Sequence, residues 1–215
     1  MNSRIEIHPA ICHGQPAIRA WRSLLPALAL GALASLPFTP TPSRAATATV
    51  GGVTWRYDLA GNAAVVTGAN PVKGKLSIPA ALDGHPVKSI AAEAFFQCTG
   101  LTGVTIPITV TNIGFMAFYQ CTGLTGVTIP DSVTDSVMQA FYDCSGLTSV
   151  KIGYRVRSIG DHAFMNCRGL ASVTIPDSVT SIGSGAFEDC SGLKSVTIGS
   201  GVTNIGQVRL MVAAA

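Results

Sequence analysis

A fixed step of 23 residues governs most of this sequence. Cysteine recurs at that step, at Cys98, Cys121, Cys144, Cys167 and Cys190. Phenylalanine, leucine and isoleucine keep the same step in three further columns, which begin at Phe95, Leu101 and Ile106. A period of roughly 20 to 50 residues is typical of stacked architectures in which each repeat forms one coil. The sequence therefore predicts a repeat solenoid.

The coil from Cys167 to Glu188 shows the local pattern. Val173 and Ile175 flank Thr174, which is the alternation of a strand with one buried face. Pro176 cannot donate a ladder hydrogen bond, so the strand is predicted to end there. The return segment, A-F-x-x-C, is predicted to form a short helical or extended turn. Because one coil cannot bury its apolar face alone, the coils are expected to stack into a parallel sheet over a continuous core.

Glycine also recurs in a column just before the A-F pair, at Gly114, Gly160, Gly183 and Gly206. A glycine column predicts a backbone position with positive φ or a tight turn. One coil departs from it, because Ser136 and Val137 stand where the other coils have Ile and Gly. We expect a locally shifted turn in that coil.

The full pattern, L-x-x-V-x-I-P-x-x-V-x-x-I-G-x-x-A-F-x-x-C, resembles the BspA-like class of leucine-rich repeats, found in bacterial and protist surface proteins. The resemblance covers roughly residues 76–206, and the preceding segment VTWRYDLAGNAAVVTG resembles the strand-turn-strand cap that begins such domains. It implies a curved, right-handed coil with a parallel β-sheet on the concave side and short helical or irregular turns on the convex side. It also implies noncovalent binding, often in adhesion at a cell surface.

The first 45 residues read as a leader. An apolar run from Leu24 to Phe38 follows two arginines, is broken by prolines, and is too short for a comfortable membrane span. Small residues then favour signal peptidase cleavage between Ala45 and Ala46, so the chain is expected to be secreted or displayed at the cell surface, without a stable membrane span after cleavage. The alternatives are an uncleaved anchor, an interior apolar helix, or a start site assigned too far upstream.

The remainder divides into four parts. These are an N-terminal, hairpin-like cap at residues 46–75, a first coil with five extra residues at 76–97, the 23-residue repeats at 98–206, and a degenerate C-terminal end at 207–215. The last part lacks an obvious polar cap, which terminal coils need for solubility. It is expected either to be shielded by another chain or to mark a fragment of a longer array.

Charge excludes one class of partner. The whole chain has 14 Lys+Arg and 11 Asp+Glu, and the leader holds four and one of these, so the segment from Ala46 has 14 − 4 = 10 and 11 − 1 = 10 and no net charge. The basic character belongs to the leader. We therefore expect no nucleic-acid partner.

The repeated cysteine is the most conspicuous candidate for chemistry. Five cysteines follow the leader and cannot all pair with one another, and no C-x-x-C motif or histidine column accompanies them. A thiol is among the side chains most often buried, so the column is predicted to be structural, with occasional pairing as the alternative. His85 and His162 stand at no catalytic spacing. The sequence predicts no metal site, no cofactor and no enzyme.

A binding surface remains. The outward strand positions carry small hydroxylated residues, including the threonine row Thr105, Thr128, Thr174 and Thr197. The one break in this outward pattern is KIGYRVR, which contains Lys151, Tyr154, Arg155 and Arg157. Tyr and Arg are enriched at binding hot spots, so these four residues and the threonine row are the predicted partner-binding residues. Ion pairing along the stack with Asp131 and Asp177 is a competing explanation for the break.

Three functional hypotheses follow. The first is a secreted or cell-surface repeat protein that binds an extracellular protein or glycan noncovalently, through the sheet and the KIGYRVR segment. The second is a structural module that stacks on another copy through its C-terminal edge, or a fragment of a longer array. The third is an ice-binding or surface-binding face made by the threonine row, which Lys151 interrupts.

Overall fold

The computed structural model describes residues 45–134 and 137–207. The predicted leader up to residue 44, Ser136 and the chain end from residue 208 lie outside the described residues. The strands at the N-terminal end are β1 (Ala46–Val50), β2 (Val53–Ala60) and β3 (Ala63–Asn70). One long sheet contains β4 (Gly74–Ser77), β7 (Leu101–Thr105), β9 (Gly126–Ile129), β10 (Ser149–Ile152), β12 (Ser172–Ile175) and β14 (Ser195–Ile198). The shorter strands are β5 (Ala81–Leu82), β6 (His85–Ile90), β8 (Asn112–Ile113), β11 (Ser158–Ile159), β13 (Ser181–Ile182) and β15 (Asn204–Ile205).

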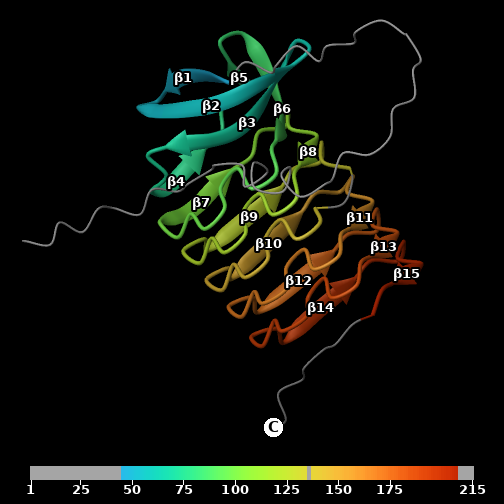
Figure 1. Ribbon diagram of the computed structural model, residues 1–215. Helices are drawn as coiled ribbons and strands as arrows, with labels where there is room; N and C mark the ends of the chain where they lie inside the picture. The colour runs from blue at the N-terminus through green and yellow to red at the C-terminus, as the bar shows by residue number, and fades with distance from the viewer. Residues whose placement is uncertain (1–44, 135–136, 208–215) are drawn as a thin grey trace, which may run out of the picture.

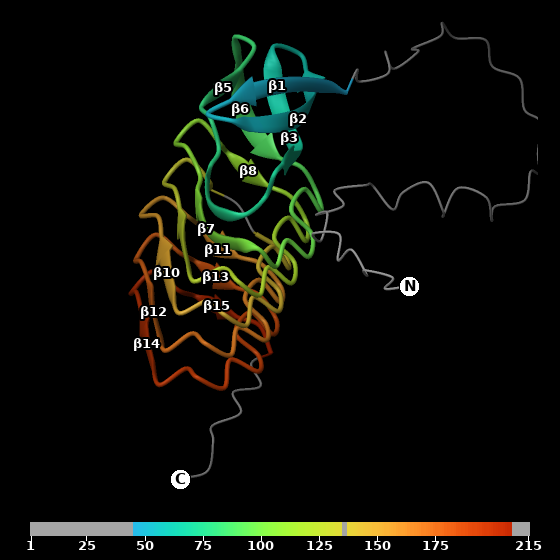
Figure 2. The ribbon, with the colours of Figure 1, turned by 90° about the vertical axis from the view of Figure 1, so that its left-hand side faces the viewer.

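The long sheet is parallel and holds one strand from each coil, in the order β14-β12-β10-β9-β7-β4. Its register follows the sequence period, since Lys151 lies opposite Thr128 and Ser172 lies opposite Ser195. The coils stack one below another in Figure 1, and β10, β12 and β14 line one side of the stack in Figure 2. The predicted parallel-strand solenoid is confirmed.

The N-terminal strands cover one end of this stack. β1, β2 and β3 form an antiparallel meander, and β3 then pairs in parallel with β6 of the first coil. Trp55 and Val66 from this meander are buried in the same core cluster as the coil residues. The meander therefore closes the upper end of the core, as Figure 1 shows.

The core consists of stacked columns of identical side chains. Phenylalanine rings form the central column, in which neighbouring centroids lie 5.1 to 5.5 Å apart and the ring planes are nearly parallel. A second aromatic column begins with Phe96, Tyr119 and Tyr142, whose centroids lie 4.8 and 5.0 Å apart. These separations equal about one strand spacing, so the inter-coil distance sets the packing of the rings.

The return side of each coil is irregular, and no helix occurs in residues 45–134 and 137–207. Helical turns, one of the two forms predicted there, are therefore absent from these coils. Each return turn contains a left-handed residue directly before the cysteine, such as Gln97 with φ of 55° and Asp143 with φ of 56°. A left-handed residue interrupts a right-handed helix. The amide of Phe95 also donates to Ala117 of the next coil, at 2.8 Å, rather than within its own coil.

The glycine column has another cause than positive φ. None of the glycines in this column has a positive φ, so that part of the prediction is wrong. These are Gly114, Gly160, Gly183 and Gly206. A Cβ at Gly183 would lie 2.5 Å from the Asp161 nitrogen and 2.6 Å from the Gly160 carbonyl carbon. Glycine is needed because the backbones of neighbouring coils approach one another there.

The coil that lacks this glycine keeps part of the standard turn. Ser136, where the shifted turn was expected to begin, lies outside the described residues. From Val137 onward the turn matches the others, because Ala140 donates to the Val137 carbonyl at 3.2 Å, as Ala117 does to Gly114.

Candidate binding surface

The cysteine column lies in the core and offers no reactive group. Cys121, Cys144, Cys167 and Cys190 carry free thiols. Each free thiol donates to the carbonyl of a phenylalanine in the preceding coil, as Cys121 does to Phe95 at 3.1 Å. Burial raises the pKa of all four thiols, to about 12 for Cys121 and about 11 for Cys190. The described residues contain no cluster of side chains suited to a metal ion.

We expect a thiol reagent at pH 8 to leave these four cysteines unmodified in the native protein and to modify all of them in denaturant. The thiolate is the reactive form, and burial disfavours it. Because the unfolded thiol ionises near pH 9 and folded Cys121 only near 12, stability should fall as the pH rises through that interval. Spectroscopic thiol titration with and without denaturant measures both states. Rapid labelling of the native protein would contradict the structural role of the column.

The predicted threonine row lies on the exposed face of the long sheet. Thr105, Thr128, Thr174 and Thr197 all point outward, and Lys151 occupies the same row in the middle coil. The neighbouring outward positions on β10, β12 and β14 are serines, Ser149, Ser172 and Ser195. The face therefore carries mainly hydroxylated side chains, with Lys151 in the threonine row and Lys75 of β4 in the neighbouring row.

Next to this row, the chain leaves β10 and forms a corner that carries Tyr154, Arg155 and Arg157. We call these three residues, together with Lys151, the Tyr154 corner. All four side chains are exposed, and 71% of the Tyr154 surface is accessible. The structure thus brings together the four residues of KIGYRVR that the sequence singled out.

Tyr154 lines two grooves. The sheet-side groove has a volume of about 290 Å³ and is lined by Ser149, Val150, Lys151, Ile152, Tyr154, Ser172, Thr174 and Pro176. The arginine groove has a volume of about 280 Å³ and is lined by Thr134, Tyr154, Arg155, Arg157 and Ser178. Each groove therefore contains at least one cation, and Tyr154 borders both.

The backbone of the corner is fixed by neighbouring coils. The Tyr154 amide donates to Asp131 Oδ1 at 2.7 Å. Gly153 makes this contact possible, since a Cβ there would lie 2.8 Å from the Asp131 nitrogen. The Arg157 amide donates to the Thr134 carbonyl at 2.9 Å. These bonds hold the corner in place before any partner binds, which lowers the entropic cost of binding.

The competing explanation, ion pairing along the stack, does not describe the corner. No ion pair joins Lys151, Arg155 or Arg157 to a carboxylate in the part of the chain that the structure describes. The nearby carboxylates bind backbone amides instead, Asp131 that of Tyr154 and Asp177 that of Ser200, both at 2.7 Å. The three cations of the corner are therefore exposed, and none has an acidic partner among residues 45–134 and 137–207.

Three residues at the corner were missed as site residues by the sequence analysis. Thr134 and Ser178 line the arginine groove, and Asp131 holds the Tyr154 amide. The 23-residue spacing could have identified them, because Thr134 stands one period before Arg157 and Ser178 stands one period after Arg155. Asp131 likewise stands one period before Tyr154.

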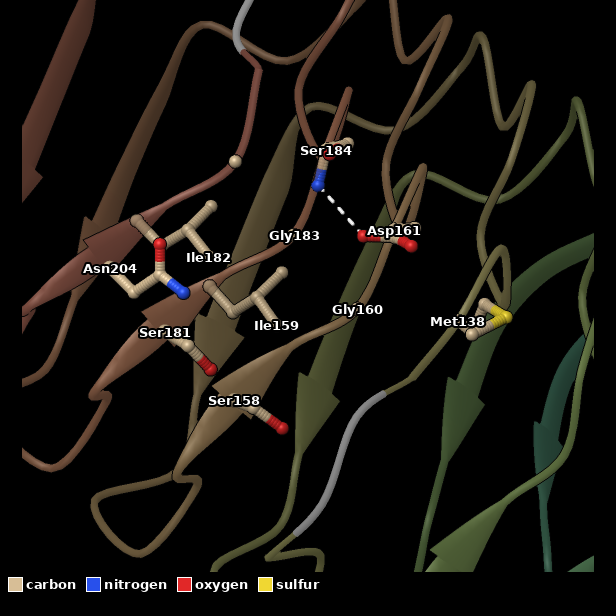
Figure 3. Close-up of a pocket in the computed structure, with 11 residues that line it drawn as sticks. Met138, Ser158, Ile159, Gly160, Asp161, Ser181, Ile182, Gly183, Ser184 and Asn204 are labelled. Carbon is tan, nitrogen blue, oxygen red and sulfur yellow. Dashed lines mark hydrogen bonds between the residues drawn. The ribbon is translucent and has the colours of Figure 1, made fainter.

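A different hollow, of about 360 Å³, lies beside the short parallel strands β11, β13 and β15 (Figure 3). Ser158, Ser181 and Asn204 line it, and Asp161 is the charged residue of its lining. Figure 3 shows that Asp161 accepts the Ser184 amide, at 2.8 Å. Because the Asp161 carboxylate already binds a backbone amide, this hollow offers a partner fewer charged and aromatic side chains than the Tyr154 corner does.

Comparisons of the sequence and of the structure with known proteins both find leucine-rich repeat proteins. A family model described as the BspA type leucine rich repeat region matches residues 88–210 in six copies. A crystal structure of a Treponema pallidum leucine-rich repeat protein, with 29% identity and a TM-score of 0.66, matches over 71% of this chain and 83% of that one. No curated protein matches the sequence.

Two further solved structures are similar. A leucine-rich cell surface protein from Faecalibacterium prausnitzii has 32% identity and a TM-score of 0.58, over 75% of this chain and 50% of that one. A leucine-rich repeat protein from Bacteroides ovatus has 31% identity and a TM-score of 0.64, over 71% of this chain and 42% of that one. The chain thus spans half or less of these two proteins.

Proposed function

Because this chain belongs to the BspA-type leucine-rich repeat family, we propose that it is a secreted or cell-surface module that binds an extracellular macromolecule noncovalently. Repeat solenoids present extended surfaces for binding, and this family and fold are typically non-catalytic. The similar Faecalibacterium prausnitzii protein is a cell surface protein, which supports this location. No helix within residues 45–134 and 137–207 is long and apolar enough to cross a membrane.

The single observation that carries this proposal is the Tyr154 corner. The outward strand positions of the repeated coils carry mainly small hydroxylated residues and glycines, which give little binding energy by themselves. The corner adds an exposed aromatic ring and three exposed cations, which have no acidic partner among the described residues, on a backbone held by its neighbours. We propose that the partner contacts the threonine row as a broad surface and the corner as its anchor.

Self-association is the second candidate function, and one observation favours it. In the last described coil, Val196, Ile198 and Ile205 are 37%, 49% and 50% exposed, whereas Val173, Ile175 and Ile182, one period earlier, are buried. A second copy stacked there would cover these side chains. No observation favours an ice-binding face, because Lys151 interrupts the threonine row.

Capture of a partner from extracellular material tests the proposal. The segment from Ala46 onward, immobilised, is expected to retain a macromolecule, and the triple variant Tyr154→Thr, Arg155→Thr, Arg157→Thr is expected to retain at least tenfold less. Mass spectrometry identifies what is bound, and thermal unfolding checks that the variant folds. Undiminished capture by the folded variant would contradict the anchor. Capture of this chain's own copies alone would favour self-association instead.

A further inference from the structure

The arrangement of cations around Tyr154 indicates what kind of ligand the corner recognises. Tyr154 borders both grooves, with Lys151 in the sheet-side groove and Arg155 and Arg157 in the arginine groove. A linear ligand that crosses the ring would therefore meet positive charge on both sides. A chain with acidic groups at intervals fits this order of charges.

The arginine groove suits planar anionic groups in particular. Arg155 and Arg157 both line it, and the guanidinium group binds carboxylates and similar oxyanions through paired N–H donors. Asp131 and Asp177 lie in the flanking coils, but each accepts a backbone amide, and neither pairs with these arginines. The arginine donors are thus available to a ligand.

The shape of the grooves favours a sugar chain over a peptide. Both are open to solvent, and the lining of the sheet-side groove contributes hydroxyl groups from Ser149, Ser172 and Thr174. A peptide anchor residue needs a well-packed, desolvated pocket, and neither groove encloses one. A ring that is 71% exposed instead presents a flat apolar surface with a hydroxyl at its edge, on which a sugar ring can lie.

We propose that the Tyr154 corner binds an acidic glycan, either free or carried on a glycoprotein. One sugar ring lies on Tyr154, while carboxylate or sulfate groups bind Lys151 on one side and Arg155 and Arg157 on the other. This inference rests on the proposed function, since it names the chemistry of the ligand that the same corner anchors.

Calorimetric titration of the purified protein with three polymers of matched length tests the ligand class. Chondroitin sulfate oligosaccharides are acidic glycans, dextran oligosaccharides are neutral glycans, and poly-glutamate is an acidic peptide. We expect chondroitin sulfate to bind at least tenfold more tightly than either of the others, and its affinity to fall as NaCl screens the exposed charges. Equal binding of poly-glutamate, or no binding of chondroitin sulfate, would overturn the inference.

Variants of the purified protein locate the contact. We expect Tyr154→Ala, and separately the pair Arg155→Gln with Arg157→Gln, to weaken chondroitin sulfate binding about tenfold. Tyr154→Phe should bind almost as well as the unchanged protein, because it keeps the ring. Arg168→Gln is the matched control, since Arg168 is exposed and lines neither groove. If Arg168→Gln weakens binding as much as the paired variant does, the site is not the corner.

Competition separates this inference from the proposed function. If the partner captured through the corner is released by chondroitin sulfate, and is no longer captured once its glycans are removed enzymatically, the ligand is a glycan carried by a protein. Capture of a free polysaccharide identifies the other source. If capture depends on the corner but chondroitin sulfate does not compete, the proposed function stands and the glycan inference fails. If capture is independent of the corner, the proposed function itself fails.

Discussion

Replacement of Phe141 by alanine is expected to lower the free energy of unfolding by about 3 to 5 kcal/mol. Phe141 is fully buried and lies between Phe118 and Phe164, with centroid distances of 5.3 and 5.4 Å. The cavity cannot close readily, because hydrogen bonds between coils hold the backbone on both sides. The amide of Phe141, for example, donates to Ala163 of the next coil at 3.0 Å. Unfolding in urea, followed by circular dichroism, measures the loss.

Phe187→Ala is the matched control for this prediction. Phe187 is the last phenylalanine of the same column, is 7% exposed, and stacks on Phe164 at 5.5 Å. Among the described residues it has one stacking neighbour where Phe141 has two, so its replacement should cost less. Equal losses at the two positions would show that the stacked column is not what stabilises the solenoid.

The sequence period predicted the features that depend on the repeat itself. The strand register, with Lys151 opposite Thr128, follows directly from the 23-residue step. The buried phenylalanine and cysteine columns follow from the same step, because identical side chains in successive coils must stack. The parallel sheet, the coil length and the core could therefore be predicted from the residues alone.

The return turns could not be predicted in the same way. Their shape depends on left-handed residues such as Gln97, Gln120 and Asp143, and glutamine rarely marks that conformation. The glycine column was misassigned because its cause lies in the neighbouring coil, whose backbone approaches Gly183. Such contacts appear only when one coil is placed on another.

The binding surface was partly visible in the sequence. Lys151, Tyr154 and the two arginines stood out because they depart from the pattern of the neighbouring coils. The structure added the two grooves and the way in which Asp131 orients the corner through the Tyr154 amide. Among the described residues no carboxylate pairs with the cations of the corner, and Asp131 binds a backbone amide instead.

Restoring the repeat pattern at the corner is expected to abolish binding without loss of stability. The variant carries Lys151→Thr, Tyr154→Asp, Arg155→Ser and Arg157→Thr, which gives these positions the residues of the next coil. The variant keeps Gly153 and the backbone amide at position 154. The hydrogen bond of 2.7 Å from that amide to Asp131 Oδ1 should therefore remain. All four replaced side chains are exposed, and surface replacements usually change stability by about 0.5 kcal/mol or less.

The central claim is that binding depends on the coil that departs from the repeat, rather than on the parts of the surface that are copied. The direct test compares partner capture and unfolding midpoint for the restored-repeat variant and for a row variant with Thr105→Ala, Thr128→Ala and Thr197→Ala. We predict that the restored-repeat variant unfolds at an unchanged midpoint and captures no partner, whereas the row variant loses only a few-fold in capture. Full capture by the restored-repeat variant, together with loss of capture by the row variant, would contradict the claim.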